Sequence, residues 1–164
     1  MSWRIADSIQ SARIREALYI LSGPVIDINE SNSCQLSNEI ELCMRRQLAT
    51  NGFESGTRDV CLRVMSQLLN TLYDYSCISE CKQLRTYALA SSRLAWTCLA
   101  NEPPLVLDTI QPSQMYMEFR RDVHTRHPAS PNPEGNRIVG VVWPGLRQGN
   151  LQGASLYRAV VLTA

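Results

Sequence analysis

Two histidines and a pair of cysteines are the residues of this sequence whose spacing first suggests chemistry. His124 and His127 would share a face on a helix and could hold one metal ion. Asp122 is the only carboxylate close to them, whereas a catalytic zinc ion usually needs three protein ligands. Cys77 and Cys81 form CxxxC, not the CxxC of redox and zinc motifs. We interpret the histidines as a helix end and the cysteines as packing residues, and predict no metal and no cofactor.

Other catalytic patterns are missing from the sequence. It contains no Walker-type phosphate loop and no GxGxxG. A Cys–His nucleophilic pair could still assemble in space, but no Gly-flanked elbow favours one. Paired carboxylates such as Glu39 and Glu41 fall in an exposed helical pattern. We therefore expect a protein that is not an enzyme and has no catalytic residues.

The arginines are the stronger indication of function. Lys82 is the only lysine, so nearly all of the 16 basic residues carry planar guanidinium groups, which suit bidentate contacts to carboxylates and phosphates. Several of them surround a proline-rich segment over 127–136. We predict that anionic phosphates bind Arg120, Arg121, Arg126, Arg137 and Arg158. The alternative is a solvated surface with local ion pairs to Glu118 and Asp122.

Length and composition limit the remaining classes. The 164 residues, 45% hydrophobic and 19% charged, are typical of one globular domain. A net charge of +1 and the lack of aromatic residues among the arginines argue against nucleic acid as a partner. No apolar run approaches the length of a membrane span, and the first residues do not form a signal peptide. We expect a soluble, intracellular chain whose six cysteines are reduced and buried.

Residues 1–102 have the periodicity of helices. The first helix is expected from Ser2, as N-cap, to the stop at Gly23-Pro24, and residues 25–33 connect it to a second helix that ends at Asn51-Gly52. A third helix carries an apolar stripe between Val60 and Tyr73. The fourth, over about 79–101, has a heptad-like seam of mostly small residues, which predicts close packing against a neighbouring helix. The seam consists of Cys77, Cys81, Leu84, Ala88, Ser91, Ala95 and Cys98.

After Pro104 the pattern changes. Residues 105–107 suggest a short strand or extended segment, and 112–126 suggest a short helix. Two runs rich in β-branched residues, 137–143 and 156–162, predict an antiparallel hairpin with a long loop. The predicted fold is mainly α: a bundle of four to five helices with a small C-terminal antiparallel β-hairpin (α+β), forming one domain over 1–164 with subregions 1–102 and 103–164.

Short motifs in the last part of the chain carry a resemblance to a known family. The run Val141-Val142-Trp143-Pro144-Gly145-Leu146 precedes a second strand over 156–163, and Arg93-Leu94-Ala95-Trp96 lies on the fourth helix. In this order, over about 77–164, these motifs resemble the C-terminal domain of the mitochondria-eating protein family. The motif positions are Arg93, Trp96, Trp143, Pro144 and Leu146, and we interpret both tryptophans as core anchors.

The resemblance implies a non-enzymatic module of mitochondrial quality control that self-associates and engages mitochondrial membranes, with cardiolipin as its lipid. It implies a cytoplasmic protein that associates with mitochondria peripherally and could form homo-oligomers. The family's domain normally follows coiled-coil segments, which this chain lacks, so it is expected to be an excised domain or a minimal relative.

A second hypothesis is a protein-interaction or self-association scaffold that binds no lipid. A basic patch beside an apolar opening would favour the lipid module. An exposed apolar strip on the first helix, including Trp3, Ile5 and Ile9, would favour the scaffold.

Overall fold

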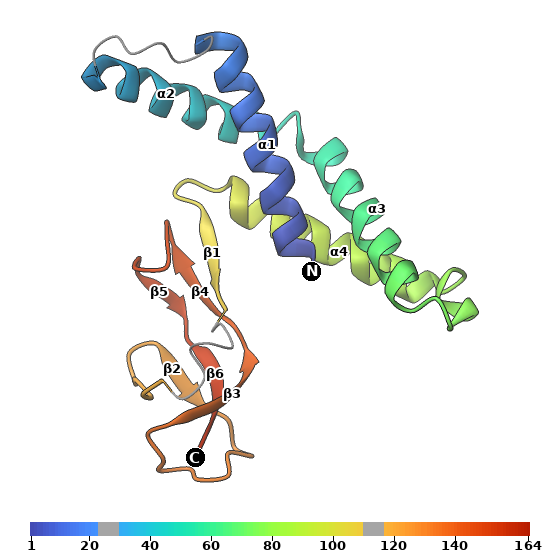
Figure 1. Cartoon of the computed structure of the whole chain (residues 1–164), viewed down its shortest axis with the longest axis vertical. Coiled ribbons are helices and arrows are strands. Elements are labelled where there is room, and N and C mark those ends of the chain that lie inside the picture. The colour runs from blue at the N-terminus through green and yellow to red at the C-terminus, as the bar shows by residue number, and fades with distance from the viewer. Residues whose placement is uncertain (23–29, 110–116) are drawn as a thin grey trace. The chain divides into compact units, whose positions relative to one another are not determined.

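The chain forms two compact units, an α unit over residues 1–102 and a β unit over residues 103–164 (Figure 1). The structure, a computed structural model, describes residues 1–22, 30–109 and 117–164. The α unit contains α1 (Ser2–Ser22), α2 (Glu30–Ala49), α3 (Phe53–Thr71), the 3₁₀ turn η1 (Ser76–Ile78) and α4 (Lys82–Ala100). Within the described residues, no helix combines the length and apolar character that crossing a bilayer requires.

The core of the α unit is built around Trp96. Its side chain is fully buried, and its indole Nε1 donates a hydrogen bond to the C=O of Leu48 at 2.8 Å. Gly56 of α3 approaches the ring so closely that a Cβ there would lie 2.2 Å from it. Helix α1 packs against the other three helices, and α3 packs along α4. The buried apolar cluster contains Ile5, Ala6, Ile9, Ile14, Leu48, Val60, Val64, Ala88, Ala95, Trp96 and Leu99.

Side chains satisfy the carbonyl groups at two helix ends of this unit. The last C=O groups of a helix have no intrahelical N–H partner. Leu48 lies one residue from the end of α2, so its hydrogen bond from Trp96 closes that end. Arg45 does the same for α4, donating from Nη1 to the C=O of Leu99 at 3.0 Å while Nη2 bonds Glu41 at 2.6 Å. These contacts tie α2 to α4.

The β unit contains two three-stranded sheets. Its strands are β1 (Leu105–Asp108), β2 (His124–Arg126), β3 (Ile138–Trp143), β4 (Gly145–Gln148), β5 (Ser155–Tyr157) and β6 (Ala159–Thr163). One sheet has the order β1-β4-β5 and is antiparallel. In the other, of order β2-β6-β3, β6 is central, parallel to β2 and antiparallel to β3. The chain passes between the sheets at Pro144 and again at Arg158.

Three features stabilise these sheets. Ile138, Ala159 and Val161 are fully buried and form a small core with Phe119 packed against it. Arg147 of β4 and Asp108 of β1 form a largely buried ion pair, with Nε and Oδ2 2.6 Å apart. Gly149 has a φ of +79°, which favours glycine, and its N–H donates to the C=O of Pro104.

The predicted helices of the α unit are confirmed, with different limits. Ser2 is the first helical residue, not a cap, and its hydroxyl group lies 3.0 Å from that of Ser91. Residues 30–33, expected in a connection, begin α2, while Gly23-Pro24 and 25–29 lie outside the described residues. Of the small-residue seam, Ala88, Ala95 and Cys98 are buried, and Ser91 donates back to the C=O of Ala88, as predicted.

The predicted architecture of the last third is wrong in two respects. The predicted antiparallel pairing is present between β3 and β6, but the run 156–162 is divided between β5 and β6. The expected long loop supplies β4, which forms a second sheet with β1 and β5. The helix expected over 112–126 is absent from residues 117–126. There, Met117 and Phe119 make backbone hydrogen bonds with Ile138 and Asn136, and residues 124–126 pair with β6. Residues 112–116 lie outside the described part. The fold is therefore mixed α+β, not a helical bundle with one hairpin.

The burial predictions for tryptophan and cysteine hold only in part. Trp96 is a core anchor, but Trp143 is 68% exposed at the end of β3. The five described cysteines are free thiols; Cys98 is buried, which raises its pKa, whereas Cys43 and Cys77 are exposed. The exposed apolar strip on α1 that would favour the scaffold is absent, because Ile5 and Ile9 are buried in the core.

Candidate functional site

One cleft of the β unit is lined by two of the predicted arginines. Its volume is about 620 Å³, and its lining residues are Phe119, Arg121, Arg126, Pro133, Glu134 and Asn136. Arg126 ends β2, and residues 133–136 belong to the segment that leads into β3. The backbone N–H of Phe119 donates to the C=O of Asn136 at 2.6 Å, which joins two sides of the cleft.

Arg126 is held in place by its neighbours. Its Nη2 donates to the C=O of Gly135 at 3.0 Å, and its guanidinium carbon lies 3.9 Å from the centre of the Phe119 ring. Its Nε is buried and has no hydrogen-bond partner. A buried donor without a partner is unfavourable by about 1–3 kcal/mol. The hydrogen bond to Gly135 and the stacking on Phe119 therefore hold the positive charge of Arg126 in one place at the wall of the cleft.

Arg121 supplies the second positive charge of the cleft. Its side chain is exposed, and no ion pair joins it to a carboxylate among the described residues. Glu134 lines the same cleft and offsets one of the two positive charges. The lining thus carries a net charge of +1 and two guanidinium groups.

The other three predicted arginines do not line this cleft. Arg120 is paired with Asp122, bonding through Nε at 3.2 Å and through Nη2. This pair raises the pKa of Arg120 and lowers that of Asp122, mainly through the side-chain hydrogen bond. Arg137 is exposed where its backbone bridges to Glu118, and Arg158 is exposed between β5 and β6.

The two histidines lie in the β unit near these arginines, but not on a helix. His124 is buried in β2, and its Nδ1 accepts a hydrogen bond from the backbone N–H of Arg120 at 3.0 Å. Burial lowers the pKa of His124, and the charged groups that act on it are Asp108, Arg120, Asp122 and Arg147. The Nδ1 of His127 accepts from the N–H of Ala129 at 3.1 Å. Across the described residues, no three His, Cys, Asp or Glu side chains gather as they would around a metal ion.

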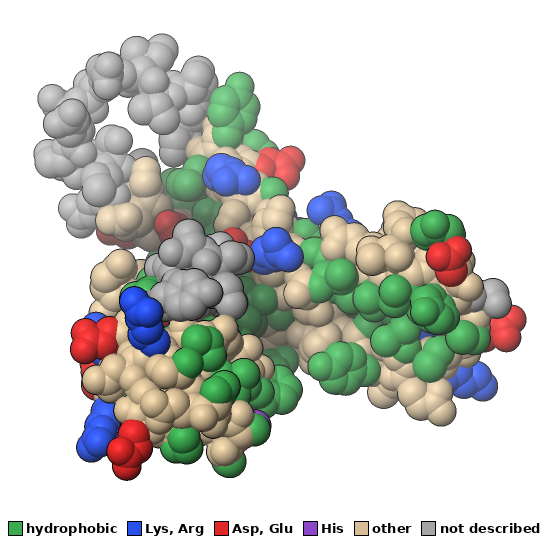
Figure 2. Space-filling view, turned by 60° about the horizontal axis from the view of Figure 1, so that its bottom comes forward, with side chains coloured by type: hydrophobic (Ala, Val, Ile, Leu, Met, Phe, Trp, Pro, Cys, Tyr) green, Lys and Arg blue, Asp and Glu red, His purple; other side chains and the backbone are tan. Residues whose placement is uncertain are grey.

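The motif residues lie in both units. Arg93 makes a long contact with Glu54 (3.5 Å), and Trp96 occupies the α-unit core. Pro144 and Leu146 are partly buried, and Leu146 pairs with Leu107 and Tyr157. Hydrophobic side chains reach the surface of both units (Figure 2). In the β unit they include Val141, Val142, Trp143, Leu156 and Tyr157, of which Trp143 and Tyr157 are exposed by 68% and 70%.

The family assignment follows from the whole chain. The family model described as "Mitochondria-eating protein" matches residues 1–163. The chain belongs to the mitochondria-eating protein family. The match extends over residues 1–76 as well, beyond the range of 77–164 that the short motifs cover, and it makes the chain a member of a mitochondrial quality-control family. No curated protein and no solved structure matches the chain.

Sequence reasoning missed the partners that shape the cleft in this family member. Phe119 was expected inside a helix, so its stacking with Arg126 was not foreseen. Asn136 and Glu134 were seen only as loop residues. The proline-rich composition of 127–136 was the available signal, because it marked a segment that is neither helix nor strand.

Proposed function

We propose that this chain is a non-enzymatic lipid-binding module whose β unit holds the headgroup of an anionic mitochondrial phospholipid, cardiolipin. The observation that carries the proposal is that two guanidinium groups, those of Arg121 and Arg126, line one cleft. Guanidinium groups form short, charge-assisted hydrogen bonds to phosphate oxygens. Cardiolipin has two phosphates, which matches two arginines in one cleft.

Exposed aromatic residues of the β unit support a membrane as the partner. Trp and Tyr favour the interface between headgroups and acyl chains, because their rings are apolar with a polar edge. Trp143 and Tyr157 are both largely exposed, and Arg158 follows Tyr157 directly. Membrane contact of this kind would be peripheral and would bring a cytoplasmic protein to mitochondria.

Co-sedimentation with vesicles tests this function. The full chain is mixed with phosphatidylcholine vesicles that contain cardiolipin, phosphatidylserine or no anionic lipid, at low and at physiological salt. We expect binding that requires cardiolipin and weakens with salt. Arg121→Ala should reduce it about fivefold, since one arginine near a membrane contributes about 1 kcal/mol.

Two further variants locate the site. Arg126→Lys keeps the charge but loses the planar fork, so it should also weaken binding. Arg15→Ala removes an exposed arginine of α1 and serves as the matched control. No binding to cardiolipin vesicles, or equal binding by the wild-type chain and Arg121→Ala, would reject the proposal.

Self-association is the second candidate function. Several large apolar side chains of the α unit are exposed, as a helix–helix interface would require. They are Tyr19, Ile20, Leu21, Leu62, Leu72, Tyr73, Tyr75, Tyr87 and Leu94. Sedimentation equilibrium of the full chain measures self-association. A chain that dimerises with increasing concentration and does not bind vesicles would favour the scaffold.

A further inference from the structure

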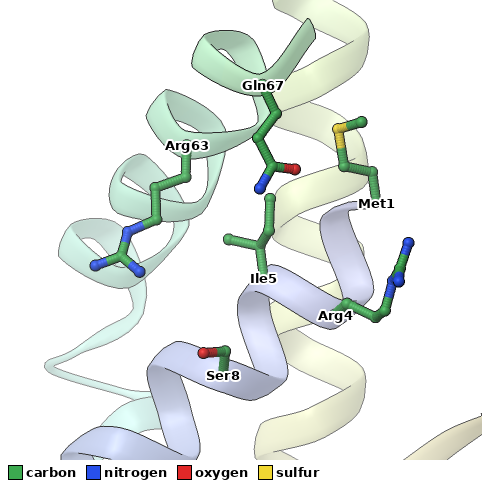
Figure 3. A pocket seen from close by; sticks show the side chains of 6 residues that line it. All are labelled: Met1, Arg4, Ile5, Ser8, Arg63 and Gln67. Carbon is green, nitrogen blue, oxygen red and sulfur yellow. The ribbon is translucent and has the colours of Figure 1, made fainter. Parts of the chain in front are cut away.

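A second pocket, in the α unit, lies between α1 and α3. Its volume is about 360 Å³, and it is lined by Met1, Arg4, Ile5, Ser8, Arg63 and Gln67. Figure 3 shows Ile5 and Gln67 in the middle, with Arg63 of α3 and Arg4 of α1 on either side. Ile5 is 9% exposed and belongs to the core, so it gives the pocket an apolar floor.

The charge of this lining is unusual within the described part of the chain. Arg4 and Arg63 line it, and no carboxylate does. In contrast, Glu16 accompanies Arg13 in another α-unit pocket, and Glu134 lies in the β-unit cleft. The pocket therefore carries two uncompensated positive charges.

Both acidic residues of α3 pair with arginines outside the pocket, and Asp7 of α1, three residues after Arg4, forms no ion pair with it within the described part of the chain. Asp59, one turn before Arg63 on α3, is bonded to Arg13 with Nη2 and Oδ2 2.8 Å apart. Glu54 is engaged by Arg93 at 3.5 Å. Among the described residues, no ion pair joins Arg4 or Arg63 to a carboxylate.

The neutral side chains add hydrogen-bonding capacity. The hydroxyl group of Ser8 and the amide of Gln67 line the pocket, and within the described residues neither makes a protein hydrogen bond. A hydroxyl group and an amide NH₂ can both donate to an oxyanion. In Figure 3 the guanidinium groups of Arg4 and Arg63 point to opposite sides, away from Ile5. Both side chains are exposed and have several rotatable bonds, so they can turn toward a ligand lying on Ile5.

From these observations we infer that the α1–α3 pocket binds a phosphate monoester of a small organic molecule. Two guanidinium groups match the two negative charges that a monoester carries near neutral pH. A free phosphate ion would use the arginines but not the apolar floor of Ile5 and the exposed Met1. An organic group attached to the phosphate would cover both. This site is separate from the proposed lipid cleft and does not depend on it.

NMR titration of the full chain with phenyl phosphate, inorganic phosphate and phenol tests the inference. We expect phenyl phosphate to shift the backbone signals of Ile5, Ser8 and Gln67 and to bind more tightly than inorganic phosphate, with phenol inactive. Arg4→Gln and Arg63→Gln should each weaken phenyl phosphate about tenfold, the usual loss for one charge-assisted hydrogen bond. Phosphatidic acid vesicles, which present the same monoester on a membrane, distinguish a lipid source from a soluble one.

Matched controls come from the same helices. Arg15→Gln on α1 and Arg58→Gln on α3 remove exposed arginines that do not line the pocket, so affinity should stay within about twofold. If the control variants lost as much affinity for phenyl phosphate as Arg4→Gln and Arg63→Gln, the loss would reflect net charge alone, and the site would be rejected. Shifts confined to the β unit, or equal affinity for phenyl phosphate and inorganic phosphate, would reject it as well.

Discussion

Gly56 of α3 lies against the indole of Trp96 on α4, so closely that a Cβ at Gly56 would come within 2.2 Å of the ring. Trp96 is fully buried, and its Nε1–H is bonded to the C=O of Leu48. The pair therefore determines how closely α3 and α4 approach each other.

Gly56→Ala is expected to destabilise the α unit. Helix propensity alone favours alanine over glycine by about 1 kcal/mol. The overlap with the rigid indole should outweigh this gain and leave a net loss of about 1–3 kcal/mol in the free energy of unfolding. Urea unfolding followed by circular dichroism measures the loss. Ser66→Ala, at an exposed position of α3, is the control and should not destabilise; a stabilised Gly56→Ala chain would contradict the packing.

Trp96→Phe should also destabilise the α unit, for a different reason. The substitution removes the Nε1–H that bonds the C=O of Leu48 and leaves that carbonyl unsatisfied at the end of α2. Together with the lost volume, this should lower the free energy of unfolding by about 2–4 kcal/mol. Trp143→Phe is the matched control, because its side chain is 68% exposed and should change stability by less than about 0.5 kcal/mol. Similar losses of stability in both variants would be inconsistent with a stabilising hydrogen bond from Trp96 to Leu48 at the end of α2.

The stability of the β unit is expected to fall in mild acid because of His124. Burial lowers its pKa in the folded state, and its Nδ1 must be unprotonated to accept the N–H of Arg120. The unfolded chain, with a histidine pKa near 6.5, therefore binds more protons between that pH and the lower folded value. The contribution of His124 to the free energy of unfolding is fully present above about pH 6.5 and decreases as the pH falls below that value.

Urea unfolding at a series of pH values, followed by NMR signals of the β unit, measures this decline. In His124→Asn the amide oxygen can replace Nδ1 as acceptor without titrating near neutral pH. That variant should lose the part of the pH dependence that His124 causes. If the dependence of the free energy of unfolding on pH were the same in His124→Asn as in the wild-type chain, other titrating groups would be its cause.

Asp122→Asn should strengthen binding to cardiolipin vesicles if the proposed function is correct. Asp122 holds Arg120 in an exposed ion pair, and removing its charge frees that guanidinium group close to Arg121. An additional free arginine near an anionic membrane predicts a gain of about threefold to fivefold in affinity. Co-sedimentation at physiological salt measures it. Asp74→Asn, which removes an exposed carboxylate of the α unit, should have no such effect, and a gain of equal size there would indicate net charge alone.

The helices of the α unit could be predicted because each is indicated by the spacing of apolar residues within its own segment of sequence. Apolar residues at helical spacing place Val60 and Val64 on one face, and both are buried. The small seam residues Ala88 and Ala95 lie in the same core. The exact ends of the helices could not be predicted in the same way. Contacts between residues distant in sequence form there, such as that between Ser2 and Ser91.

The β unit resisted prediction because its pairings are between distant residues. Three residues, His124–Arg126, form a strand only through parallel pairing with β6, and so short a segment carries no periodicity. The cleft depends on the same long-range contacts, since Arg126 stacks on Phe119 only after both segments have met β3 and β6. The arginines could be named from the sequence, but not which two share a cleft.

The central position of β6 affects how the chain folds as it is synthesised. Both β2 and β3 pair with β6, and neither pairs with the other, so their sheet cannot form until residues 159–163 have left the ribosome. The residues that pack the core of the α unit all precede residue 102, so they leave the ribosome earlier. During that interval the nascent β2 and β3 segments expose unpaired backbone, so a chaperone that shields extended segments would act on residues 124–143.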